Sequence, residues 1–402
     1  MATRSAPTIY DALGFNTQGD TQSVAIQQIA RTAAASLLNN PRDNPIMAEP
    51  PAITSSASVT SALSNITTWN AASAGVFNFY GGVPTSDGAG GMKALSATVS
   101  STFAQYICRV HTVADCLKIQ FKFNDISNTG TVNFIIDGQY VSATPVTPGF
   151  SGITYTILDF TDAGGRAVRN IVMEMNNCDF ISASVLPTET LNKPGGVVRS
   201  VFAVGDSITA SGGMTTVFNG YFQVLCDILG VQNAINGGVG GTGFLAAGGQ
   251  LTFRGRVADM VACNPDVILI AGGHNDTGST AAAITTEVLA YLTAIRAQRV
   301  LANTPIIFLG VINGLLTLAL TQPVETAIAA AITAFNDPSV IFVPLVNDPS
   351  GPIFTGTGYS GHTASDGNFD IYGHSDAVHP NDAGHNFLAR RIADRLMTQV
   401  LV

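Results

Sequence analysis

The stretch Val197–Thr209, VVRSVFAVGDSIT, decides the fold, because an apolar run leads directly into a turn that contains glycine. Four more apolar runs follow, VQNAING, PDVILIAGG, TPIIFLGVI and PSVIFVPLV, and helical patterns separate them. Five strands alternating with helices imply a parallel sheet with helices on both faces. Residues 196–402 are therefore predicted to form an α/β domain. The expected helices lie near 215–229, 252–263, 280–302, 322–336 and 381–400.

Residues 51–195 show the period of β-strands instead. LKIQFKF (117–123) and RNIVMEM (169–175) alternate apolar and polar side chains, and TVNFIID, ITYTILDF and FISASVL are further apolar runs. Turn signals such as SNTG, DGQ, PGFSG and DAGG separate them. Short alternating strands at regular spacing predict an all-β sandwich. This region carries no catalytic motif. Its one tryptophan, Trp69, is thin evidence for a sugar-binding surface, so glycan binding and a spacer role stay equally open.

Residues 1–50 form a third region, a leader. Residues 21–40 place Val24, Ile29, Ala33 and Leu37 near one helical face, and the following NPRDNPIMAEPP ends any helix. Two interpretations stay open: an arm for oligomerisation or attachment to a larger assembly, or a helix that packs on the next domain.

The composition limits the partners. The net charge is -9 and no basic cluster is present, which argues against nucleic acid and anionic membranes. No apolar segment reaches the length of a membrane span. Only 11% of residues are charged, against about 25% in typical soluble domains. A weakly charged surface is typical of proteins that work outside the cytosol, so we expect an extracellular protein or a virion component, with a cytoplasmic location as the open alternative. Since the start lacks the apolar core of a signal peptide, an extracellular protein would be exported by another route or have had its signal removed.

The five cysteines are sparse and form no C-x-x-C pair, which argues against a zinc ribbon. Cys108 and Cys116 could bridge neighbouring strands in an oxidising compartment. Five buried, reduced thiols are the simpler expectation.

The first two chemical motifs follow the first two apolar runs of the α/β domain. Ser207 lies in the turn after VFAV, where a hydroxyl is exposed but needs an adjacent base to act as a nucleophile. Residues 236–243, NGGVGGTG, can leave backbone N–H groups free to face an oxyanion. A phosphate cradle is the rival interpretation, but the loop has no lysine or arginine.

The other two motifs supply a side-chain donor and a base. Asn275, in GGHND after the third run, can donate to an oxyanion. Asp376 and His379, in DAVHPN before the last helix, can hydrogen-bond on one turn, which leaves the other imidazole nitrogen for the serine. Each motif alone has a structural explanation as a turn or cap, but their order at successive strand ends predicts one site.

With GDSIT, the glycine-rich turn, GGHND and DAVHPNDAGH in this order, about the last 205 residues resemble the SGNH hydrolases, also called GDSL esterases and lipases. The resemblance implies a flavodoxin-like, doubly wound parallel sheet of five strands. It further implies Ser207 as nucleophile, His379 as base and Asp376 as its orienter, with Asp206 as a structural support. The oxyanion would face the N–H groups of Ser207 and Gly241 and the side chain of Asn275. Because Thr242 departs from the family's pattern, Gly240 competes with Gly241.

Substrate contacts are expected from residues near these motifs. The aperiodic, glycine-rich stretch 351–376 is predicted to be a loop that lines the site. Its candidate contacts are Tyr359, His362, Asn368 and Tyr372, and His274 is a further one. A self-packed surface loop is the alternative, and His362 with His374 lacks a sensible metal ligand set.

These residues predict ester hydrolysis through an acyl-enzyme, with no cofactor or metal. A sandwich placed before an SGNH unit resembles carbohydrate esterases, so an acetylated polysaccharide is the first expectation. A short-chain lipid or general carboxylesterase is the alternative. A non-catalytic glycan-binding protein or adhesin is the alternative of another class, since fold alone does not fix function.

Overall fold

The computed structural model describes residues 42–57, 63, 66–72, 75–86, 91–95, 107–125, 128–149, 152–196 and 198–400. They belong to two compact units, one within Asn39–Ser96 and Tyr106–Val198 and one within Arg199–Val402. Most of the leader, including the helix predicted at 21–40, lies outside the described residues. The division of the chain at residues 50 and 195 stays a prediction.

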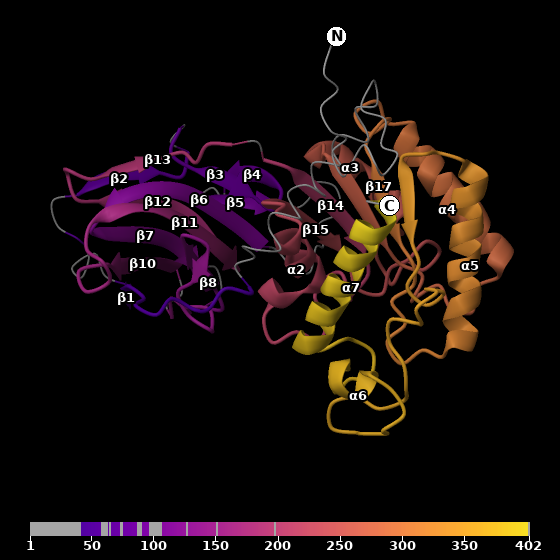
Figure 1. The fold of residues 1–402 in the computed structure, drawn as a ribbon. Coiled ribbons are helices and arrows are strands. Elements are labelled where there is room, and N and C mark those ends of the chain that lie inside the picture. Colours follow the sequence, from indigo (N-terminus) through magenta and orange to yellow (C-terminus); the bar gives the residue numbers. More distant parts are fainter. Residues whose placement is uncertain are drawn as a thin grey trace, which may run out of the picture. The chain divides into compact units, whose positions relative to one another are not determined.

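The first unit contains two antiparallel sheets (Figure 1). One has the order β1 (Ala52–Ser56), β10 (Gly152–Asp159), β7 (Lys118–Asp125), β12 (Cys178–Val185), β5 (Met92–Leu95) and β4 (Val83–Ser86), with β2 (Thr67–Asn70) also paired to β12. The other has the order β13 (Thr190–Asn192), β6 (Ile107–Cys116), β11 (Ala167–Asn176), β8 (Thr131–Ile136) and β9 (Gln139–Tyr140), with β3 (Asn78–Tyr80) also paired to β6.

A single apolar core joins these two sheets. The alternation in β7 buries Ile119, Phe121 and Phe123 on one face. Phe121 stacks on Phe134 of β8 in the other sheet, with ring centroids 5.6 Å apart. Trp69 is half-buried and packs against the same core. The predicted sandwich is therefore confirmed.

The alternative of a Cys108–Cys116 bridge between neighbouring strands is wrong. Both residues lie in β6, eight positions apart, which separates them by about 26 Å at the rise of a strand. All five cysteines are free thiols. Burial raises the pKa of Cys116 to about 12, so this thiol stays protonated and unreactive.

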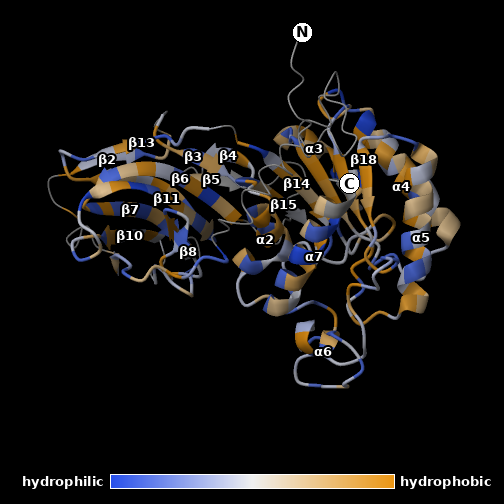
Figure 2. Cartoon of the chain, viewed as in Figure 1, coloured by the Kyte–Doolittle hydropathy of each residue, from blue (hydrophilic) through white to orange (hydrophobic). Residues whose placement is uncertain are grey.

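The second unit is built on a parallel sheet of order β15 (Asn233–Gly238), β14 (Ser200–Gly205), β16 (Val267–Ala271), β17 (Ile306–Leu309) and β18 (Val340–Val343). This order, with the first strand second, is the flavodoxin-like doubly wound arrangement, and it confirms the prediction. The strand order reverses between β14 and β16, and sheets of this type bind their ligands beyond the carboxyl ends of the strands at such a point. Figure 2 shows that these strands are strongly apolar, as burial on both faces requires.

Helices cover both faces of this sheet (Figure 1). Residues such as Ala203 and Leu269 point to α2 (Tyr221–Ile228) and α7 (Asp382–Val400). Phe202 and Ile270 point to the opposite face. That face is covered by α3 (Val257–Cys263), α4 (Ala281–Arg296) and α5 (Leu318–Phe335). Three short helices complete the described part, η2 (Val217–Asn219), η3 (Arg254–Arg256) and α6 (Phe369–Tyr372).

Helix α5 is the one described helix long and apolar enough, by length and composition, to cross a membrane. It nevertheless packs on the sheet through Val324, Ile328 and Ala331. Its buried Glu325 accepts hydrogen bonds from the backbone N–H groups of Val311, Leu345, Val346 and Asn347 at 2.7–3.2 Å. The helix therefore clamps the loops that follow β17 and β18 as a core element.

Candidate active site

Three predicted side chains meet in one hydrogen-bonded chain. His379 Nε2 lies 2.8 Å from Ser207 Oγ, although the two residues are 172 positions apart. His379 Nδ1 lies 2.7 Å from Asp376 Oδ2. Ser207 follows β14, and Asp376 and His379 lie in the turn before α7. This geometry lets His379 take a proton from the serine while the carboxylate holds the other ring nitrogen.

The carboxylate of Asp376 is oriented by its own turn. Its Oδ1 accepts the backbone N–H groups of Val378 at 2.9 Å and His379 at 3.0 Å. Partial burial alone would raise the pKa of Asp376, but these two N–H groups and the His379 imidazole together lower it well below its usual range. Asp376 is therefore a carboxylate at any pH at which His379 can act as a base.

The serine turn is held against the imidazole by a close backbone approach. A Cβ added to Gly212 would lie 2.6 Å from Cδ2 and 2.8 Å from Nε2 of His379. Gly212 N–H donates to the carbonyl of Ser207 at 2.8 Å. Only glycine at position 212 leaves room for the imidazole beside the nucleophile.

His385, in helix α7, holds the turn that contains Ser207 and Gly212, and the start of α2, through two hydrogen bonds. Its Nε2 donates to the Gly212 carbonyl at 2.9 Å, and its Nδ1 accepts the N–H of Tyr221 at 3.0 Å. Complete burial lowers the pKa of His385 to about 4, so the ring is neutral at physiological pH. The sequence places His385 inside the DAVHPNDAGH motif, but its partners become visible only in three dimensions.

The expected oxyanion donors lie around Ser207. A Cβ on Gly240 would lie 3.7 Å from the Ser207 Cβ, so this glycine lies beside the nucleophile. Gly241 has a φ of +72° and faces Gly248. Within the described residues, the N–H groups of Ser207, Gly240 and Gly241 have no hydrogen-bond acceptor. The choice between the two glycines therefore stays open.

Asn275 follows β16 and is half-exposed. One of its two amide N–H bonds donates to the Thr242 carbonyl at 2.9 Å. That bond fixes the plane of the amide and leaves the second N–H for another acceptor. The side chain can therefore serve as a preorganised donor to an oxyanion.

Two buried charged residues that the sequence did not reveal hold the glycine-rich loop. Asp276 accepts the N–H groups of Phe244, Leu245 and Ala246 at 2.9 Å each. Arg256 donates to the carbonyls of Gly237 at 2.5 Å and Gly205 at 3.1 Å, and to Thr242 Oγ1 at 3.0 Å. The pattern G-x-N-D hints at Asp276, but no sequence signal marks Arg256.

Asp206 supports the turn. It is buried, its Oδ1 accepts the N–H of Ile208 at 2.9 Å, and burial raises the pKa of its carboxyl. Among the described residues, its carboxylate bonds to the backbone of its own turn and not to the side chains of Ser207 or His379, which fits a structural role.

The candidate substrate contacts have partners within the protein. His274 Nδ1 lies 3.0 Å from the Ile312 carbonyl. A neutral ring that donates this hydrogen bond carries its proton on Nδ1, which leaves Nε2 as an acceptor for another group. Tyr359 stacks on His362, Tyr372 stacks on Phe387 of α7, and Asn368 bonds to Thr355 and Ile353. The predicted loop 351–376 contains the short helix α6. A role for these residues in binding substrate stays a prediction.

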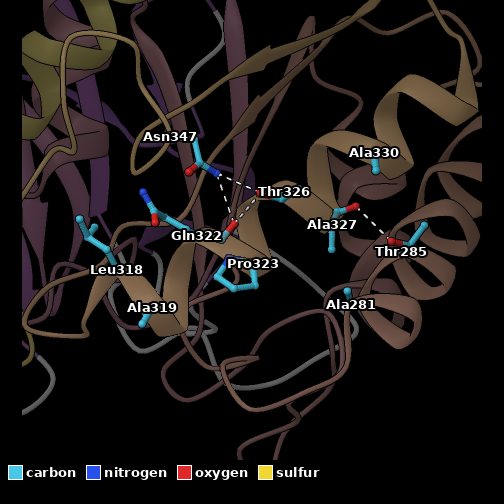
Figure 3. A pocket seen from close by; sticks show the side chains of 10 residues that line it. All are labelled: Ala281, Thr285, Leu318, Ala319, Gln322, Pro323, Thr326, Ala327, Ala330 and Asn347. Carbon is cyan, nitrogen blue, oxygen red and sulfur yellow. Dashed lines mark hydrogen bonds between the residues drawn. The ribbon is translucent and has the colours of Figure 1, made fainter.

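The described part of the α/β unit contains at least two hollows. One, of about 440 Å³, is lined by Gly213, Met214, Thr215, Ser360, His374, Asn381, Asp382 and Ala383. The other, of about 580 Å³, lies between α4 and α5 (Figure 3). None of the ten residues that line the 580 Å³ hollow is titratable. The 440 Å³ hollow borders the turn that carries Asp376 and His379. Among the described residues, no group of three His, Cys, Asp or Glu side chains is placed to hold a metal ion.

The comparisons with solved structures agree with this fold. A family two carbohydrate esterase from Cellvibrio japonicus has a TM-score of 0.57 at 13% identity, over 87% of this chain and 99% of that one. An acetyl xylan esterase from the rumen bacterium Butyrivibrio proteoclasticus has a TM-score of 0.56 at 14% identity, over 84% and 99%.

A salicylyl-acyltransferase from a tetracycline biosynthetic pathway has a TM-score of 0.58 at 13% identity, over 84% and 99% of the two chains. At such identities the likeness shows a shared fold. No curated protein gives a significant sequence match. The model of the GDSL-like lipase/acylhydrolase family matches residues 203–387, which span β14 to α7. The α/β unit of this chain is a domain of the GDSL-like lipase/acylhydrolase family.

Proposed function

We propose that the chain is a serine esterase that removes short acyl groups, acetyl first, from a carbohydrate. The observation that carries the proposal is the hydrogen-bonded chain Ser207–His379–Asp376 in a GDSL-like domain. Free N–H groups beside the serine add a place for an oxyanion. A binding protein on an inert scaffold would not need these features together.

In the first step the Ser207 oxygen attacks the ester carbonyl carbon, and its proton passes to His379 Nε2. The carbonyl oxygen becomes an oxyanion facing the N–H groups of Ser207 and of Gly241 or Gly240, and the Asn275 amide. Asp376 balances the imidazolium charge through Nδ1. The tetrahedral species then collapses, the ester C–O bond breaks, and the alcohol leaves with the proton from His379.

In the second step water attacks the acyl-enzyme. His379 takes one water proton, the oxyanion forms again against the same donors, and the bond to Ser207 Oγ breaks as His379 returns the proton to the serine. The products are the carboxylic acid and free enzyme, so the reaction balances with water as its only co-reactant.

The proposed carbohydrate substrate rests on two supports. Two of the solved structures that share this fold carry names of carbohydrate and acetyl xylan esterases. The hollow beside the catalytic turn is lined by hydroxyl, amide, imidazole and carboxylate side chains, and also by Met214, Ala383 and Gly213. Its polar groups can form hydrogen bonds with the hydroxyl groups of a sugar.

The first test is hydrolysis of a chromogenic acetate ester. We expect the native chain to turn over the ester and Ser207→Ala to lose at least about 10³-fold in kcat. Ser279→Ala, which removes an exposed serine of the same unit, is the matched control and should keep full activity. Equal, background rates for the native chain and Ser207→Ala would favour the binding-protein alternative.

The second test concerns the substrate. Acetate release from a panel of acetylated polysaccharides should exceed release from the same polysaccharides under buffer alone. Across chromogenic esters, acetate should be hydrolysed faster than octanoate. Faster octanoate turnover would overturn the acetylesterase assignment and favour a lipid or general carboxylesterase.

A further inference from the structure

A second histidine contacts the carboxylate of the proposed triad. His374 Nδ1 lies 3.1 Å from Asp376 Oδ2, the same oxygen that lies 2.7 Å from His379 Nδ1. We propose that His374 is a positioning residue for Asp376 and shares the first proton that the site takes up, so that His379 stays available as a base at lower pH. This inference rests on the proposed esterase function.

The backbone brings the two histidines together. His374 N–H donates to the His379 carbonyl at 2.8 Å, and Ala377 N–H donates to the His374 carbonyl at 3.0 Å. Ala377 has a φ of +63°, which closes the turn tightly. Both imidazoles are therefore held on the side chain of Asp376, which lies between them in the sequence.

The His374 Nδ1 atom has two possible partners at hydrogen-bond distance. Without a proton it can accept the backbone N–H of Asp376, at 3.2 Å. With a proton it can donate to Asp376 Oδ2, at 3.1 Å. Starting from the neutral tautomer that accepts the Asp376 N–H, uptake of a proton turns His374 Nδ1 into a charged donor to the catalytic carboxylate, in direct competition with His379.

Few other charges face His374 in the described part of the chain. From its own turn these are Asp376 and His379. From α7, Asp382 lines the same hollow, and its carboxylate is bonded to the backbone N–H and hydroxyl of Thr215. The neighbouring Gly213, Met214 and Ser360 carry no charge. The side chain of His374 is 40% exposed, so protons reach it from solvent.

One carboxylate cannot neutralise two imidazolium ions, so the second proton is resisted. The first proton is distributed over both rings. In the fraction of molecules in which His374 holds it, His379 is still neutral and can accept the serine proton. Without His374, the first proton binds to His379 in every molecule, and His379 can then no longer act as a base.

The test compares the pH dependence of kcat/KM for chromogenic acetate in the native chain, His374→Asn and His374→Ala. In His374→Asn, which keeps a polar group near the Nδ1 position, we expect the acid limb to move up by about 0.5–1 pH unit. In His374→Ala we expect the same shift and a kcat about three- to tenfold lower with an unchanged KM, because Asp376 is less well held. His111→Gln, which removes an imidazole from the sheet-rich unit, is the control and should leave the limb in place.

A readout that needs no activity separates this inference from the proposed function. In an NMR titration of the native chain, the ring nitrogens of His374 and His379 should change together over the same pH range. In His374→Asn, the change of His379 should move to higher pH. Independent titration of the two rings, or an acid limb that is identical in all variants, would overturn the role of His374 even if Ser207 proves to be the nucleophile.

Discussion

At Gly212 the missing side chain lets the His379 imidazole lie against the turn that carries Ser207. Gly212→Ala places a methyl group within 3 Å of the imidazole and of the Ser207 carbonyl, so we expect the ring to shift and kcat to fall about 10²-fold. The far-UV circular dichroism spectrum should remain native. Gly195→Ala, where a Cβ meets nothing within 4 Å, is the matched control. Full activity in Gly212→Ala would show that the position of the His379 imidazole does not depend on its close contact with Gly212.

Residues at this scale differ in how well the sequence reveals them. Ser207, Asn275 and His379 each follow a strand or precede a helix in a recognisable motif, so their shared edge of the sheet follows from the topology. Arg256 and Asp276 act by binding backbone groups of other loops. Sequence patterns record side-chain types along the chain but not which carbonyl or N–H group a side chain reaches, so these two residues were not predicted.

At the scale of elements, the glycine-rich loop after β15 depends on Asp276, which lies in the turn after β16. Asp276→Asn replaces an acceptor with an amide that opposes one or two of the three N–H groups. We expect kcat to fall about tenfold with little change in KM, since the loop carries an oxyanion donor. The free energy of unfolding should fall by about 1–3 kcal/mol.

The matched control for this loop is Asp337→Asn. Asp337 also accepts a backbone N–H, that of Ser339, but it precedes β18 at the amino end of the strand. We expect a loss of stability with unchanged kcat. If both variants lower kcat equally, the effect of Asp276 would reflect general loosening and not the glycine-rich loop.

The elements themselves were largely predictable, but their ends were not. The helix predicted at 280–302 ends at Arg296, because the Arg296 guanidinium binds the carbonyls of Leu301 and Thr304 and turns the chain back. The helix predicted from residue 322 begins at Leu318, so Pro323 lies inside α5. Proline in the second turn is tolerated here because the buried face of α5 packs on the sheet, a tertiary gain that local propensity does not show.

At the scale of the whole molecule, each unit has its own apolar core, which follows from the change of hydrophobic period near residue 196. The sequence predicted both architectures because alternation and short apolar runs report burial on one or both faces. It did not predict that Cys108 and Cys116 share a strand, since β6 carries buried residues on both faces and so lacks alternation.

The buried, neutral His385 makes stability depend on pH. Its folded pKa of about 4 lies below the value of 6.5 expected in the unfolded chain, so the unfolded chain binds more protons between these values. The stabilisation is complete above about pH 6.5 and is lost as the pH falls towards 4. We expect the free energy of unfolding to fall by about 2 kcal/mol from this group between pH 7 and pH 5.

This is measured by urea unfolding of the full chain, followed by the helical circular dichroism signal, since the described helices all lie in the α/β unit. His385→Asn, which keeps an acceptor for the Tyr221 N–H, should be less stable at pH 7 but lose less on acidification. An equal loss in both proteins would place the pH dependence elsewhere.

The most direct test of the central claim is covalent labelling of the nucleophile. After reaction with a fluorophosphonate, mass spectrometry of the digested chain should find one phosphonyl adduct, on the peptide that contains Ser207. Labelling should be absent in Ser207→Ala and strongly slowed in His379→Ala. An unlabelled native chain, or an adduct on another serine that persists in Ser207→Ala, would contradict the account.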